Sequence, residues 1–186
     1  MDMFTILGFV GLIVGIVVLW AISSYNGLVR QRSLVDEGWS GIDVQLKRRA
    51  DLVPNLVAVV KQYQFHEKDV LEKVTQMRSI ALDARSMDQK AEAEKGLTGA
   101  LKTLFAVAES YPDLKANQNF IDLQQQLSIL ESEIQLARRY YNGTARNYNV
   151  SVQSFPGNIV ASFFSFSPVA YFEIDSAERN NPGIKF

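Results

Sequence analysis

The chain has 186 residues, no cysteine, a single histidine and a formal net charge of −1 at pH 7. The absence of cysteine excludes thiol catalysis, thiolate metal sites and a lipoprotein anchor, and one histidine excludes a multi-histidine metal centre. A nearly balanced charge gives no electrostatic reason to expect nucleic acid as a partner.

The first predicted element is an apolar helix. Phe4 to Ile22 form a run of nineteen residues without a charge, which would make about 28 Å of helix, close to the thickness of a bilayer's hydrocarbon core. The alternative, a secretory signal peptide, would begin with basic residues and have a shorter apolar core. Here the only charged side chain before the run is Asp2. We therefore expect a permanent single-pass anchor within residues 1–24.

The orientation of this anchor follows from the charges on its two sides. Arg30 and Arg32 follow the apolar run, whereas the residues before it include no basic side chain. Because basic residues favour the cytoplasmic side of a membrane, we predict an outside N-terminus and a cytoplasmic domain.

The apolar run also contains three glycines, Gly8, Gly11 and Gly15. Gly11 and Gly15 form a G-x-x-x-G pair, a spacing that lets two membrane helices approach closely. We expect these glycines to mediate helix packing, although glycine is also simply common in membrane helices.

Residues 25–149 show helical periodicity in four successive segments. Apolar residues recur at spacings of three and four, which puts one apolar stripe on each of four helices. Breaks fall near Pro54, near Ser86 and Asp88, and near Pro112. Short connections between long helices predict an all-α, up-and-down four-helix bundle. At Pro54 a hairpin is preferred, and the alternative is a kink in one rod. The stripes are Leu28, Val35, Trp39, Ile42, Leu46 and Val53; Leu56, Val60, Tyr63, Val70, Val74, Met77 and Ala81; Ala93, Leu97, Ala100, Leu104 and Val107; and Phe120, Leu123, Leu127, Leu130, Ile134, Ala137, Tyr141 and Tyr148.

A few polar residues share these apolar stripes, among them Arg32, Arg49 and Glu67. They are candidates for a site. The preferred interpretation is structural, because such residues commonly reach water at bundle ends or pair to set the register of the helices. The lone histidine, His66, is interpreted as a partly exposed helix residue.

The last segment, residues 150–186, loses helical periodicity and has turn signals at Pro156-Gly157 and Asn181-Pro182-Gly183. Four antiparallel helices return the chain to the membrane side, so this tail should begin near the bilayer. Its aromatic residues are expected to pack on the bundle's own end, in the lipid interface, or on a neighbouring subunit. They include Phe155, Phe163, Phe164, Phe166, Tyr171, Phe172 and Phe186.

Two long strings resemble a known family. YNGLVRQRSLVDEGWSGIDVQLKRRADLVPNLVAVVKQYQFHE is similar to the opening of the LemA family, and ARRYYNGTARNYNVSVQSFPGNIVASFFSFSPVAYFEID is similar to its closing signature. The resemblance implies a bacterial inner-membrane protein with one transmembrane helix, an outside N-terminus and a cytoplasmic four-helix domain. It implies no activity and supplies no catalytic residues.

Three classes of function remain. The preferred one is a non-enzymatic membrane scaffold or adaptor that self-assembles and organises membrane partners, such as membrane proteases, in envelope stress or proteolysis. The second is a membrane-tethered sensor or ligand-binding bundle. The third is an enzyme, which is disfavoured because the chain shows no phosphate loop, dinucleotide motif or nucleophile elbow. No cofactor, metal site or catalytic residue is expected.

Overall fold

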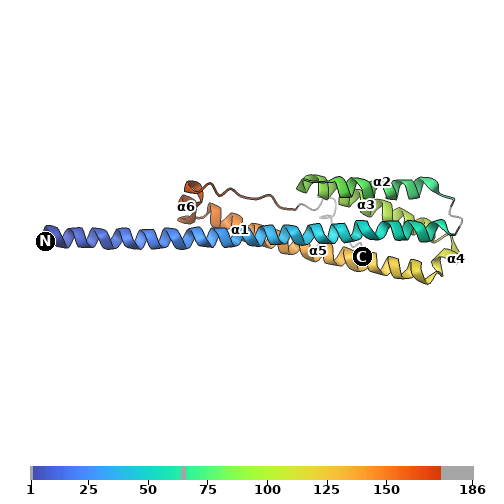
Figure 1. The fold of residues 1–186 in the computed structure, drawn as a ribbon, viewed down its shortest axis with the longest axis horizontal. Helices are drawn as coiled ribbons and strands as arrows, with labels where there is room; N and C mark the ends of the chain where they lie inside the picture. The colour runs from blue at the N-terminus through green and yellow to red at the C-terminus, as the bar shows by residue number, and fades with distance from the viewer. Residues whose placement is uncertain (1, 64–65, 173–186) are drawn as a thin grey trace, which may run out of the picture. The chain divides into compact units, whose positions relative to one another are not determined.

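The computed structural model describes residues 2–63 and 66–172, and these residues form helices and connecting segments without a strand (Figure 1). The all-α prediction is therefore confirmed. The predicted turn at Asn181-Pro182-Gly183 and the terminal Phe186 lie outside the described residues. The helices are α1 (Met3–Lys61), α2 (Lys68–Asp83), α3 (Met87–Ala108), α4 (Pro112–Lys115), α5 (Gln118–Gln153) and α6 (Gly157–Phe163).

The described residues divide into two compact units. The anchor unit comprises residues up to Trp39 together with residues 140–171, and the bundle unit comprises residues 40–139 together with Phe172. The anchor unit thus contains the first part of α1, the end of α5 and α6. The bundle unit contains the rest of α1, α2, α3, α4 and most of α5.

The bundle unit has one continuous apolar core. It is built from the predicted stripes, because residues three and four apart on a helix share one face. The described core contains Val53, Leu56 and Val60 of α1, Leu71 and Val74 of α2, Leu97, Leu101 and Leu104 of α3, Leu114 of α4, and Phe120, Leu123 and Leu127 of α5.

The hairpin preferred at Pro54 is wrong, because α1 continues through this residue and ends at Lys61. A proline has no N–H to donate to the carbonyl four residues earlier, which would leave the oxygen of Ala50 without its helical partner. In the structure Arg78 Nε donates to that oxygen at 2.8 Å. The alternative of one rod that includes Pro54 is the one observed, and the lost hydrogen bond is replaced from α2.

The connection between α1 and α2 therefore lies further along the chain than predicted. Gln62 and Tyr63 form a turn after α1, and His66 is exposed in the segment before α2. The interpretation of His66 as a helix residue is wrong. Two other breaks agree with the sequence. Ser86 begins α3 with a capping box to Gln89, and Pro112 is in the first turn of α4.

The tail is more helical than predicted. α5 runs to Gln153, beyond the predicted loss of periodicity at residue 150, and α6 follows after the turn at Pro156-Gly157. A Cβ atom on Gly157 would lie 2.8 Å from the main-chain oxygen of Ser151, so the close return of the chain requires a glycine here. Val152 and Val160 are buried on the two sides of this turn, so both helical segments pack within the anchor unit.

Candidate functional site

The first functional element is the apolar part of α1. Among the described residues, one helix is long and apolar enough to cross a membrane, and it is α1, near the N-terminus. Its most apolar window has no buried residue. Within the anchor unit, partial burial of this helix begins at Trp20, and the first fully buried residue is Leu28. The described side chains of the predicted anchor are thus exposed, except in its last turn.

The three glycines predicted to mediate helix packing lie within this bare stretch. A Cβ atom added at Gly8, Gly11 or Gly15 would meet nothing within 4 Å. Their shared face is therefore open to a second helix, and whether one occupies it stays a prediction.

The tail aromatics predicted as contact residues do not form one group. Phe164 and Phe166 surround Tyr25 of α1, with ring centroids 4.7 and 5.7 Å from its ring. Phe163 contacts Phe164 at 5.0 Å but is 81% exposed. These contacts place α6 against α1 just after the apolar run.

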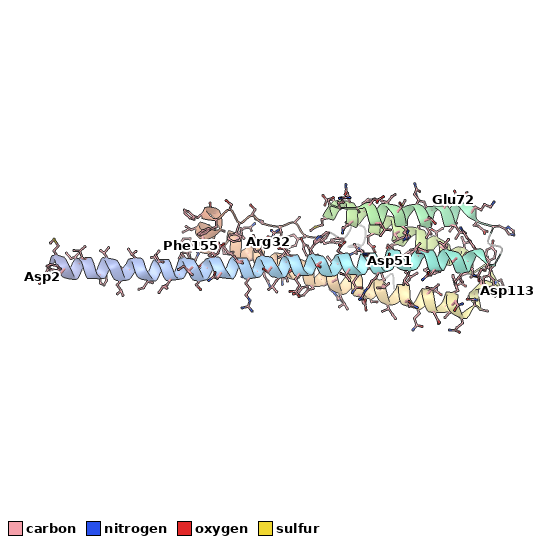
Figure 2. All side chains as sticks on the ribbon, viewed as in Figure 1. Asp2, Arg32, Asp51, Glu72, Asp113 and Phe155 are labelled. Atoms are coloured by element: carbon pink, nitrogen blue, oxygen red, sulfur yellow. The ribbon has the colours of Figure 1, made fainter. Side chains whose placement is uncertain are left out.

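The remaining predicted tail residues have different surroundings. Phe155, which is labelled in Figure 2, is 81% exposed between α5 and α6. Tyr171 is partly exposed at the end of the anchor unit. Phe172 is buried in the bundle unit, where the guanidinium carbon of Arg138 lies 4.9 Å from its ring centroid.

The segment between α6 and Phe172 is held along α5 by side-chain hydrogen bonds. Asn149 Nδ2 donates to the oxygen of Val169 at 2.9 Å, and Val169 N donates to Asn149 Oδ1 at 2.8 Å. The hydroxyl of Tyr141 donates to the oxygen of Ala170 at 2.8 Å. Burial raises the pKa of the Tyr141 hydroxyl, so it remains a donor to a higher pH than an ordinary tyrosine.

The second functional element is a buried ionic cluster in the bundle unit, formed by Arg49 of α1, Glu94 of α3, and Glu131 and Arg138 of α5. Arg49 Nη1 donates to Glu94 Oε1 and, at 2.7 Å, to Glu131 Oε2. Arg138 Nη2 lies 3.9 Å from Glu94 Oε1. Thr98 Oγ1 also donates to Glu94 Oε1, at 3.3 Å. The cluster links three helices that are far apart in the sequence.

Glu94 and Arg49 are the most buried members of the cluster, each with a side chain that is only 5% exposed. Burial raises the pKa of the Glu94 carboxyl, and the charges of Arg49 and Arg138 oppose that shift. The attraction within such a buried network is offset by the cost of removing its charges from water. Arg49 pairs with residues of two other helices, as the structural interpretation expected.

The two other stripe residues have separate partners. Arg32, labelled in Figure 2, pairs with Asp36 at 3.3 Å and lies over the ring of Tyr148. Glu67 accepts a hydrogen bond from the hydroxyl of Tyr111. The structure therefore does not bring Arg32, Arg49 and Glu67 together into one site.

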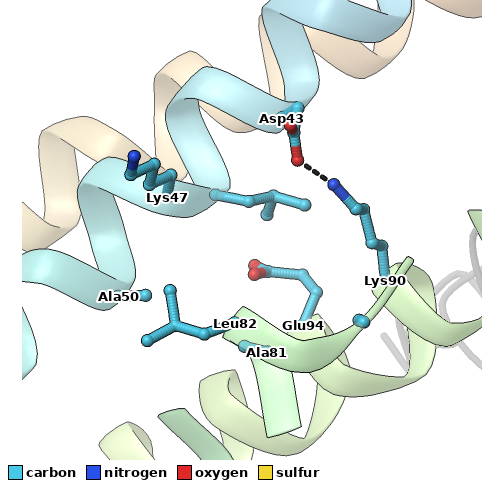
Figure 3. Close-up of a pocket in the computed structure, with 9 residues that line it drawn as sticks. Asp43, Lys47, Ala50, Ala81, Leu82, Lys90 and Glu94 are labelled. Atoms are coloured by element: carbon cyan, nitrogen blue, oxygen red, sulfur yellow. Dashed lines mark hydrogen bonds and ion pairs between the residues drawn. The ribbon is translucent and has the colours of Figure 1, made fainter. Parts of the chain in front are cut away.

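The ionic cluster borders a pocket of about 340 Å³ in the bundle unit. In Figure 3 the carboxylate of Glu94 points into this pocket, and an ion pair joins Lys90 and Asp43 at its edge. The pocket thus combines a buried acid with charges of both signs. It is lined by Asp43, Leu46, Lys47 and Ala50 of α1, Ala81 and Leu82 of α2, Ala84, and Lys90 and Glu94 of α3.

Sequence reasoning missed Glu94 and Glu131 as partners of Arg49, and Arg138 as a second cation beside Glu94. A signal for Glu94 was present, since this residue precedes Leu97 by three positions and Leu101 by seven, which places it on the buried face of α3. Its pairing with Arg49 had no local signal.

Together these features define, for residues 2–63 and 66–172, an all-helical architecture with one candidate membrane span and a bundle that contains a buried ionic cluster. The sequence profile of the LemA family matches residues 38–186. The chain is also 31% identical over 180 residues to Protein LemA of Metamycoplasma hominis, which covers 95% of this chain and 80% of that relative. The chain belongs to the LemA family.

More distant relatives carry a different name. Magnetosome protein MamQ 2 of Paramagnetospirillum magneticum is 23% identical over 175 residues, and Magnetosome protein MamQ of Magnetospirillum gryphiswaldense is 22% identical over 174 residues. In both comparisons the match covers 80% of this chain but only 64% of the relative.

Proposed function

We propose that this protein is a non-enzymatic scaffold or adaptor, anchored in the bacterial inner membrane with its N-terminus outside and its bundle in the cytoplasm. In this proposal the anchor self-associates and the bundle presents a rigid surface to other membrane proteins, such as membrane proteases, in envelope stress or proteolysis. Its partners are the lipid bilayer and further copies of the chain.

The observation that carries the proposal is the open glycine face of α1. Gly8, Gly11 and Gly15 share one side of the helix and have no neighbour within 4 Å. In lipid, helices associate through close backbone packing of such small residues, since lipid tails provide no hydrophobic driving force. This face supports a helix pair or a larger ring of anchors.

One further feature supports a structural role. The buried cluster of Arg49, Glu94 and Glu131 joins three helices, and a network of this kind would favour one arrangement of the bundle.

Disulfide crosslinking in native membranes tests the self-association directly, because the chain contains no cysteine. Val18 follows Gly11 by seven residues and lies on the glycine face, whereas Ile13 lies about 200° around the helix from Gly11. We expect Val18→Cys to form a disulfide-linked dimer on mild oxidation and Ile13→Cys to remain monomeric. Equal crosslinking of both variants, or of neither, would contradict the proposal.

The pocket beside Glu94 supports a second candidate function, a membrane-tethered sensor that binds a small molecule. Its volume of about 340 Å³ suits a small ligand. A small molecule that entered it would meet the carboxylate of Glu94 and the ion pair between Lys90 and Asp43. A screen of amino acids and related zwitterions by thermal melting tests this. A melting shift that Glu94→Gln abolishes would support the sensor, and no shift with any compound would count against it.

A further inference from the structure

One side of the exposed surface of α6 carries large apolar side chains. Ile159 and Phe163 lie one turn apart on α6 and are both exposed, and Phe155 is exposed immediately before the helix. Water-soluble proteins do not normally leave large apolar side chains gathered in this way unless a partner covers them.

The sequence around α6 indicates what kind of surface covers these side chains. No charged residue occurs from Asn147 to Phe172, a run of 26 residues. An anionic membrane surface would be recognised through basic side chains. A run without charge instead suits the apolar side of a lipid interface, where aromatic rings are favoured.

The position of α6 along α1 supplies the decisive observation. Phe164 and Phe166 contact Tyr25, which follows the end of the apolar run at Ile22 by three residues, or about 4.5 Å of helix. Partial burial of α1 begins at Trp20, inside the run itself. Both contacts belong to the anchor unit. α6 is therefore held at the level where the candidate span leaves the hydrocarbon.

We infer that α6, with Phe155, Ile159 and Phe163 on its exposed face, lies in the lipid interface as a second, monotopic membrane contact beside the transmembrane anchor. An interfacial helix typically buries its apolar face about 5–10 Å into the boundary between headgroups and acyl chains. Because the segment has no charge, this contact does not depend on anionic lipid. The inference rests on the membrane anchoring in the proposed function, but not on self-association.

This second contact has a mechanical consequence within the anchor unit. The tilt and rotation of a transmembrane helix are set by its packing against other helices and by the residues that anchor it at the interface. With α6 inserted beside Tyr25, the anchor unit touches the bilayer at two points. The stretch of α1 from Tyr25 to Trp39, which packs in the same unit, is then held at a defined angle to the membrane.

Site-directed spin labelling of the full chain in phosphatidylcholine vesicles tests the inference. Single cysteines at Ile159 and Phe163 should carry nitroxides that oxygen reaches readily and a water-soluble nickel chelate does not. Asn158, which is exposed on a different side of α6, provides the matched control on the same helix. Leu136, exposed on α5 in the bundle unit, provides the fully aqueous reference. The nickel chelate should reach both control labels readily.

Two results would overturn the inference. Equal nickel access at Phe163 and Leu136 would place α6 in water. Protection of Phe163 from both oxygen and nickel, together with dipolar broadening, would show that a neighbouring chain covers it instead of lipid. Dilution with unlabelled protein removes the broadening and leaves the depth measurement intact. Spin labelling therefore tests the lipid contact, and crosslinking of Val18→Cys tests the self-association. A negative result in one experiment does not decide the other.

Discussion

The side chain of Arg78 donates a hydrogen bond to the main-chain oxygen of Ala50, the acceptor that Pro54 leaves without a helical donor. The donor comes from α2 and the acceptor from α1, and the distance is 2.8 Å. This contact explains how a helix of 59 residues passes through a proline. It also ties the path of α1 to the position of α2.

A double-mutant cycle tests this relationship. Arg78→Met should lower the free energy of unfolding by about 1 kcal/mol, because it leaves the Ala50 oxygen unpaired. In a Pro54→Ala background the new N–H of residue 54 supplies the missing bond, so the same substitution should cost much less. Denaturant unfolding of the four proteins in detergent measures the coupling. Equal costs of Arg78→Met in both backgrounds would contradict the explanation.

The two hydrogen bonds between the Asn149 side chain and the main chain of Val169 lead to a second prediction. Asn149→Ala removes both hydrogen bonds and leaves the N–H and C=O of Val169 unpaired, which should cost about 1–3 kcal/mol. Hydrogen exchange at the Val169 amide should also become faster. Asn147→Ala is the matched control, since Asn147 is exposed one half-turn earlier on α5. An unchanged exchange rate in Asn149→Ala would show that the segment is held by other contacts.

The burial of Glu94 predicts a particular pH dependence of stability. Because burial raises the pKa of Glu94 in the folded state, the folded protein holds this proton more tightly than the unfolded chain. The contribution of Glu94 to stability is then fully present below the unfolded pKa of about 4.5, and it is lost as the pH rises through the folded value.

Glu94→Gln provides the comparison, because the amide does not titrate. Between pH 4 and 8, the melting temperature of the wild-type protein should fall with rising pH relative to that of this variant. Above the folded pKa of Glu94 the difference between the two melting temperatures should become constant. A wild-type protein that gains stability relative to Glu94→Gln over this range would mean that the arginines outweigh the burial.

Two glycines of α1 offer a contrasting pair. A Cβ atom on Gly38 would lie 3.1 Å from the Cα atom of Tyr141, whereas one on Gly41 would meet nothing within 4 Å. Gly38→Ala should therefore destabilise the anchor unit by about 1–3 kcal/mol through crowding against the backbone of α5. Gly41→Ala should stabilise the helix by up to about 1 kcal/mol. Circular dichroism during urea unfolding distinguishes the two, and equal effects would argue against the close approach.

Much of this fold could be predicted because its signals are local. The spacing that marked Leu97, Ile134 and Tyr148 as stripe residues depends only on neighbours within two turns, and all three are buried. Ser86 was recognisable as a cap for the same reason, since its partner Gln89 is three residues away.

What the sequence could not predict depends on partners far along the chain. Pro54 is a helix breaker by every local rule, and the residue that compensates for it, Arg78, lies on another helix. Glu94 and Arg49 are 45 residues apart and have no pairing signal. The helical character of α6 was missed because Pro156 and Gly157 suggested a loop throughout, although they break the helix at one turn only.

The measurement that tests the scaffold most directly is the mass of the full chain extracted in mild detergent. The account predicts a discrete assembly of several copies, which Gly11→Leu combined with Gly15→Leu should dissociate by closing the open face of α1. Ile13→Leu combined with Val17→Leu, on the opposite face, should leave the mass unchanged. A monomeric mass for the unmodified chain under the same conditions would contradict the claim that its anchors self-associate.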